Sequence, residues 1–179
     1  MRKSLFLTLA TACMALFVAG CSGGGGGNNV ASSGKGYVRA RVTFGDSQAA
    51  RHYHERTGAD AATATITVTV TIEGMYGDTD RAFTPVYGSV TIDPGTLKGS
   101  ADLLAVPVGM NHLLTATATF STYARESGTV TGAEVVKGII ENVSENETRD
   151  GIADARTTPA AEAFIQYAKN NNTTLNRAP

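Results

Sequence analysis

The run His52-Tyr53-His54-Glu55 contains the residue types that most readily bind a metal ion. On a β-strand, His52 and His54 would point to the same side and could share a metal, whereas on a helix their side chains would diverge. A zinc site takes three or four ligands, and only Glu55 and the distant His112 remain to complete one. The surrounding sequence, SQAARHYHER, is more typical of a helix or loop than of a strand. We therefore predict a solvated loop without a metal, and keep a small metal-dependent enzyme as the alternative hypothesis.

Aspartates in turns form a second group of candidate ligands. Asp78 and Asp80 lie in one glycine-flanked turn, and Asp93 begins another, Asp93-Pro94-Gly95. Calcium needs six to eight oxygen ligands, and no complete calcium-loop pattern surrounds these residues. We interpret all three aspartates as ordinary turn residues. The sequence also has no GxSxG motif, which argues against a serine nucleophile. We predict no catalytic residues, no metal and no cofactor.

The charge balance argues against a nucleic-acid partner. The 179-residue chain has 15 lysines and arginines against 16 aspartates and glutamates. Arg2 and Lys3 lie in a front segment that we expect to be removed, which leaves 13 basic and 16 acidic groups and a net charge of −3. Nucleic-acid binding depends on a clustered basic face. The remaining length, with 42% hydrophobic residues overall, is enough for one ordinary folded domain.

Residues 1–20 have the three parts of an export signal. Two basic residues stand near the start, the apolar run 5–18 follows, and the small residues Ala19 and Gly20 precede a cleavage site. The apolar run of about 14 residues is shorter than the ~20 that a membrane-spanning helix needs. We therefore predict a cleaved signal peptide.

The segment 18–21, VAGC, resembles the lipobox of bacterial lipoproteins. The resemblance implies that a diacylglyceryl group is attached to the Cys21 thiol, that the signal is cut just before Cys21, and that the new amino group is acylated. Ser22 stands where this family uses aspartate to retain a protein at the inner membrane, so an outer-membrane destination is implied. Cys13 would leave with the signal, and Cys21 alone can form no intramolecular disulfide.

The middle of the chain has the alternation of β-strands. In residues 63–72, TATITVTVTI, apolar residues and threonines alternate over ten positions, which predicts a strand with one buried and one exposed face. Further strands are predicted at 37–44, 86–92, 100–106 and 112–123, with turn residues between them. No helical spacer long enough for a parallel crossover separates these segments, which favours antiparallel pairing.

Two segments near the end need separate interpretation. Residues 134–143, EVVKGIIENV, have apolar residues at helical spacing, but their β-branching and internal glycine favour one or two strands over a helix. Residues 159–169 predict a helix, with Ala161, Phe164, Ile165 and Ala168 on one stripe. The threonines before Pro159 are expected to cap it, with Glu162 in its first turn and Lys169 in its last.

The stretch GSVTI…ADLLAVPVGMNHLLTATATFS resembles immunoglobulin-like or transthyretin-like modules of bacterial lipoproteins. In those modules a strand leads to a proline-glycine corner, here residues 106–109, and then to a long strand. The later SGTVTGAEVVKGIIENVSENET resembles their closing strands. The resemblance covers residues 37–155 loosely, contains no catalytic motif, and implies an all-β antiparallel sandwich.

We therefore expect four parts: a signal peptide (1–20), a glycine-rich flexible tether (21–35), a β-sandwich domain (36–155) and a C-terminal helix and tail (156–179). The expected protein is held at the outer membrane of a bacterial envelope by lipid on Cys21. It is expected to be a non-enzymatic binding, adhesion or spacer module for a glycan or protein, with no nucleic-acid partner. The alternatives are a periplasm-facing accessory subunit of an envelope complex and a small metal-dependent enzyme using the His52–Glu55 loop.

Overall fold

The computed structural model describes residues 34–48, 50–51, 64–77, 81–124, 128–171 and 173, all within the compact unit Ala31–Pro179. The predicted signal peptide, Cys21, most of the tether, the His52–Glu55 run and the Asp78 turn lie outside the described residues. The element order is β1 (Lys35–Thr43), β2 (Ala64–Glu73), β3 (Val86–Asp93), β4 (Lys98–Ala101), β5 (Leu104–Pro107), β6 (Gly109–Ala124), β7 (Gly128–Val143), β8 (Thr148–Ala153) and α2 (Thr157–Asn170).

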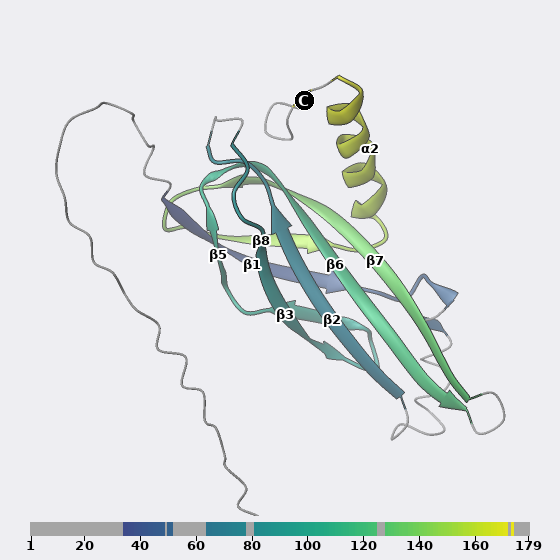
Figure 1. Cartoon of the computed structure of the whole chain (residues 1–179). Coiled ribbons are helices and arrows are strands. Elements are labelled where there is room, and N and C mark those ends of the chain that lie inside the picture. The colour runs from purple at the N-terminus through teal and green to yellow at the C-terminus, as the bar shows by residue number, and fades with distance from the viewer. Residues whose placement is uncertain are drawn as a thin grey trace, which may run out of the picture. The chain divides into compact units, whose positions relative to one another are not determined.

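The described chain is mostly antiparallel β-structure with one short C-terminal helix, as predicted. The strands form one curled sheet in the order β5-β1-β4-β3-β2-β6-β7, and β8 pairs with β1 (Figure 1). β3 changes partners along its length: Val86–Ser89 pair with β2, and Val90–Asp93 pair with β4. The sheet therefore bends at β3, and its concave side encloses the core.

The predicted alternation is confirmed in the strands that build this core. In β1 the side chains of Val38, Ala40 and Val42 are buried while their neighbours are more exposed. In β2 and β6 the inward apolar residues are buried and lie opposite one another, so that Val70 pairs with Ala116. Every second residue of these strands faces the interior because strand side chains alternate between the two faces.

The prediction of one continuous strand at residues 100–106 is wrong. It is divided into β4 and β5, which both pair antiparallel with β1, β4 at Arg41–Thr43 and β5 at Lys35–Val38. Asp102 and Leu103 between them are exposed and outside both strands. The chain thus leaves β1 for two residues and then pairs with it again.

The expectation of purely antiparallel pairing is also wrong at one place. β8, which was not predicted as a separate strand, runs parallel to β1, with Tyr37 opposite Thr148 and Val42 opposite Ala153. The whole domain between them acts as the crossover that a parallel pair requires. Sequence patterns indicate pairing between neighbouring segments, and β1 and β8 lie at opposite ends of the domain sequence, so this pair could not be read from them.

Residues 134–143 form part of a strand, as favoured. β7 pairs with β6 along its full length, from Gly128 opposite Ala124 to Val143 opposite Gly109. Gly138, which weakened the helical interpretation, has a packing role in the strand. A Cβ at this position would overlap the backbone carbonyl oxygen of Ile152. Only glycine therefore allows β8 to approach β7 this closely.

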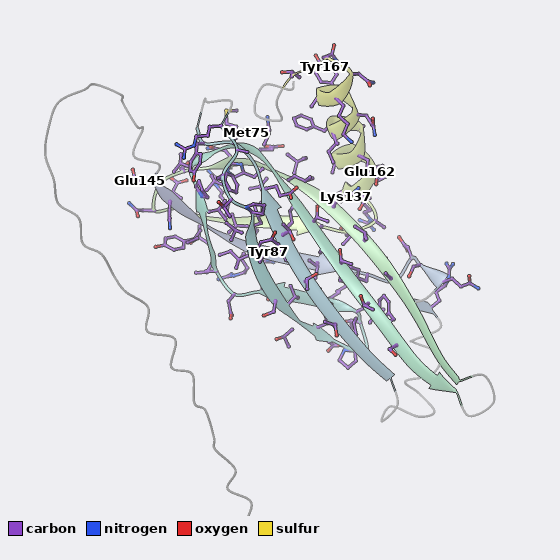
Figure 2. All side chains as sticks on the ribbon, viewed as in Figure 1. Met75, Tyr87, Lys137, Glu145, Glu162 and Tyr167 are labelled. Atoms are coloured by element: carbon purple, nitrogen blue, oxygen red, sulfur yellow. The ribbon has the colours of Figure 1, made fainter. Side chains whose placement is uncertain are left out.

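Helix α2 confirms the predicted segment and its buried stripe. Ala161 and Ala168 are buried, and Phe164 and Ile165 are half-buried. The helix lies beside β7 (Figure 1), and its Glu162 forms an ion pair with Lys137 of that strand at 2.9 Å (Figure 2). The prediction that Glu162 occupies the first turn is wrong, because the helix begins two residues earlier than expected. The Glu162 carboxylate instead links the helix to strand β7.

The threonines before Pro159 do not cap the helix as predicted. The N-cap residue is Arg156, and it makes no side-chain capping bond. Asp154, two residues earlier, accepts hydrogen bonds at its Oδ1 from the N–H groups of Arg156 and Thr157. The threonine hydroxyls instead bind strand β7: Thr157 donates to the carbonyl oxygen of Lys137, and Thr158 accepts from the Lys137 N–H at 2.8 Å. These bonds satisfy backbone groups that an edge strand would otherwise leave open.

Candidate functional site

Of the residues singled out in the sequence, His112 and Asp93 are described by the structure. His112 begins the buried face of β6, next to the corner between β5 and β6 that the proline-glycine pattern predicts. Its Nε2 donates a hydrogen bond to the carbonyl oxygen of Pro107 at 2.9 Å, which leaves Nδ1 as the unprotonated nitrogen of a neutral ring. No hydrogen bond reaches Nδ1 within the described part of the chain.

The surroundings of His112 are apolar rather than metal-binding. The ring of Phe83 meets it edge to face, with centroids 5.1 Å apart, and Gly74 and Gly109 lie against it so closely that neither has room for a Cβ. Burial lowers the pKa of His112, because the charged form loses its hydration. Among the described residues, no three His, Cys, Asp or Glu side chains gather as a metal site would require. His112 is thus a packed core residue with one unsatisfied nitrogen.

Asp93 is confirmed as a turn residue. Its Oδ1 accepts hydrogen bonds from the N–H groups of Gly95 and Thr96, both at 2.8 Å. The backbone N–H and then the hydroxyl of Thr96 are the main causes that lower the pKa of Asp93. The carboxylate is therefore ionised at neutral pH and is held by its own turn, at the β3–β4 hairpin.

An open groove of about 790 Å³ lies on the outer face of the sheet beside this turn, across β1, β4 and β3. Strand register explains which side chains meet there. Arg41, Ser100 and Thr91 form one row across the three strands, and the next row contains Lys98 opposite Asp93. Residues directly opposite in paired strands share a face. Arg39, two residues before Arg41, lies on the same face and also lines the groove.

One exposed cation of the groove forms an ion pair, and two others do not form one within the described residues. The Nη2 of Arg41 pairs with Oδ2 of Asp150 from β8 at 2.8 Å. Arg39 and Lys98 have no ion pair within the described residues, although Asp150 is opposite Arg39 and Asp93 is opposite Lys98 in register. With respect to the described residues, the Arg39 guanidinium and the Lys98 ammonium group are thus available to an anion, and the hydroxyls of the first row lie in the same groove.

A second depression of about 360 Å³ continues from the first, and the two share Thr43 and Lys98. Its other walls come from the start of the β1–β2 connection and from the segment before α2, and include Asp46 and Arg156. Lys98 therefore stands between two adjoining hollows rather than at the end of one.

The carboxylate of Glu134 fixes one wall of this second depression. This β7 side chain is buried, with 8% of its surface exposed, and accepts hydrogen bonds from the N–H groups of Gly45, Asp46 and Ser47, each at 3.2 Å. Gly45 has φ = 139°, a conformation that glycine adopts readily. The three N–H groups converge on one anion because the chain turns here, so the connection from β1 to β2 begins from a fixed point. Residues 48, 50 and 51, within the segment predicted as a solvated loop, are helical.

Arginine, lysine, serine and threonine side chains give the groove many hydrogen-bond donors, and two of its cations have no ion pair among the residues that the structure describes. Arginine binds a planar carboxylate with two parallel hydrogen bonds, whereas lysine provides a compact charge. The exposed Tyr37 lies on the same face of β1 as Arg39, two residues before it, and adds an aromatic surface next to these charges. The arrangement is suited to holding an anionic, hydroxyl-rich ligand.

Comparison of the chain with models of known families, with curated proteins and with solved structures finds no match. Among the described residues, no helix combines the length and the apolar character needed to cross a membrane.

Sequence reasoning missed this groove, although part of the signal was present. The alternation in residues 37–44 places Arg39 and Arg41 together on the outer face of a predicted strand. Lys98 and Ser100 are found beside them only once the register of β4 on β1 is known. That register depends on the break at residues 102–103, for which the sequence gives no clear signal.

Proposed function

We propose that this chain is a lipid-anchored protein of the bacterial envelope whose β-domain is a non-enzymatic binding module. The observation that carries the anchoring is the order of residues at the front of the chain: two basic residues, a short apolar run, and VAGC ending at Cys21. Two or three acyl chains bind a bilayer far more firmly than one. The anchor would keep the domain at the outer membrane without a membrane-spanning segment.

The groove on β1, β4 and β3 supports binding rather than catalysis. It is open and formed by exposed side chains of neighbouring strands, with Arg39 and Lys98 unpaired in the described residues. Binding across such a sheet face needs no moving part. A tether of roughly 14 residues would have an r.m.s. reach of ~20 Å, enough to turn the domain toward a ligand near the membrane.

The assignment of the fold as an immunoglobulin-like or transthyretin-like sandwich is part of the same proposal. The bend at β3, which divides the strands into a β1-β4-β5-β8 group and a β2-β6-β7 group, is consistent with the two layers of an immunoglobulin-like or transthyretin-like sandwich. The proline-glycine corner between β5 and β6 agrees with the resemblance on which that assignment was based.

Membrane fractionation of cells that express the whole chain tests the anchoring. In the wild type, a clickable palmitate analogue should label the protein and the protein should remain in the outer-membrane fraction. The Cys21→Ala variant should be unlabelled and leave the membrane, whereas Cys13→Ala is a matched control that should behave like the wild type. An unlabelled wild-type protein, or labelling and membrane retention that survive Cys21→Ala, would refute the anchor.

A further inference from the structure

We infer that the groove on β1, β4 and β3 binds an acidic polysaccharide through its carboxylate groups. The inference rests on the proposed binding function and names the chemical class of its ligand. Its basis is charge complementarity: Arg39 and Lys98 provide positive charges that no carboxylate within the described residues neutralises by an ion pair, on a face rich in hydroxyl groups. A saccharide offers hydroxyls to bind Thr91 and Ser100 and carboxylates to bind the two cations.

The shape of the site favours a polymer. The groove is open and shares Thr43 and Lys98 with the second depression, so an extended ligand can reach both hollows. A small anion would touch only one cation at a time, because Arg39 lies on β1 and Lys98 on the neighbouring β4, in different rows. A chain with repeated carboxylates can reach both cations together.

The density of charge argues for a polysaccharide over nucleic acid or an anionic bilayer. Arg41 is already paired with Asp150, and Asp93 adds a negative charge to the groove. Duplex DNA has a charge every ~1.7 Å and would meet those carboxylates closely. Attraction to anionic lipid usually takes 4–8 clustered basic residues. The two hollows together have only the lower number, and the carboxylates of Asp46, Asp93 and Asp154 lie among them. A polymer with at most one charge per sugar unit matches the two separated cations, Arg39 and Lys98, that have no ion pair within the described residues.

One exposed tyrosine lies next to Arg39, and a second lies farther along the outer face of β3. Tyr37 is 40% exposed on the face of β1 that carries Arg39. Tyr87 of β3 is 70% exposed and is labelled in Figure 2. Aromatic rings provide flat apolar surfaces on which sugar rings can stack, whereas an isolated phosphate or carboxylate would make no use of them.

Affinity electrophoresis of the whole purified chain in neutral detergent tests this inference. Polygalacturonate in the gel should retard the wild-type protein, and its fully methyl-esterified form, which has the same backbone without the charges, should not. Raising the ionic strength should weaken the retardation, because exposed charges are screened. Equal retardation by the two polymers, or stronger binding to a DNA oligonucleotide than to polygalacturonate, would overturn the inference.

Variants locate the site. The double variant Arg39→Gln/Lys98→Gln should bind polygalacturonate about tenfold more weakly, because each exposed charge pair contributes a few-fold to affinity. Both side chains are exposed, and circular dichroism should confirm that the double variant remains folded. The control Lys169→Gln, an exposed lysine on α2, should bind as the wild type does. Retention of full affinity by the double variant would contradict the assigned site.

The two proposals fail in different ways. Loss of lipid labelling with intact polygalacturonate binding would remove the anchor and leave the ligand assignment standing. An anchored, folded protein that polygalacturonate does not retard would remove the ligand assignment alone.

Discussion

Replacing Glu134 with glutamine should destabilise the domain by about 2 kcal/mol. The carboxylate accepts hydrogen bonds from three N–H groups, and Glu134→Gln keeps one oxygen but turns an NH₂ group toward the same donors. Hydrogen bonds to charged groups contribute about 1.5–3 kcal/mol each, and distances of 3.2 Å put these at the weak end. Losing the charge and one or two of the bonds gives this magnitude.

Urea-induced unfolding and thermal melting of the purified chain measure this change. A loss of about 2 kcal/mol corresponds to a fall in Tm of roughly 7 °C for a domain of this size. Glu141→Gln is the matched control, since Glu141 lies on the same strand with its side chain exposed, and its stability should change by less than about 0.5 kcal/mol. Equal stability of Glu134→Gln and the wild type would show that the three N–H groups do not depend on the carboxylate.

Three further predictions concern other contacts of the domain. Because burial lowers the pKa of His112, the unfolded state binds a proton more readily than the folded state below pH about 6.5. Stability should therefore fall as the pH drops, by at most ~1.4 kcal/mol per pH unit. Urea unfolding at pH 7 and pH 5 measures this component, which should vanish in His112→Leu. Gly74→Ala should cost about 2 kcal/mol or more in thermal melting, because its Cβ would overlap His112 Nδ1; a wild-type Tm would show that this contact is loose. Thr158→Val should cost about 1–2 kcal/mol, because Lys137 loses a hydrogen-bond acceptor, and limited proteolysis should then release α2 sooner; unchanged cleavage would contradict this role.

The sequence was sufficient to predict the strands with regular alternation. In β1, in β2 and in the stretch Leu114–Phe120 of β6, the inward positions are apolar and the outward positions are charged, threonine or tyrosine, so the local pattern and the tertiary structure agree. The helix could be predicted for the same reason. Its N-terminal boundary could not, because the Thr157 and Thr158 hydroxyls bind β7, a strand that is remote in sequence.

The strand β8 lacked a comparable signal. Its sequence, TRDGIA, has small residues at its two buried positions, Gly151 and Ala153, and contains an exposed isoleucine between them. Small residues are required there because β8 packs closely against Ile140 and Leu114. Hydrophobic periodicity does not distinguish a strand whose buried residues are small from a loop.

The candidate site could be predicted only in part. The outward arginines of β1 were visible in the sequence, whereas their neighbours depend on pairing across three strands. Metal-binding residue types drew attention to His112, but its position in an apolar corner depends on close contacts with Gly74 and Gly109. Residue type therefore suggested a chemistry that the packing around this histidine does not support.

The parallel pairing of β1 with β8 has a consequence for the order in which the chain can fold. β1 leaves the ribosome early, and the strand that covers one of its edges is synthesised last before the helix. The β6–β7 hairpin can form from neighbouring segments as soon as it emerges, but β1 must wait for nearly the whole chain. A nascent chain cut short before residue 148 would therefore keep β1 open on that side. The fold can therefore be completed only after β8 has been synthesised. A truncated product would expose an unpaired strand edge to proteases.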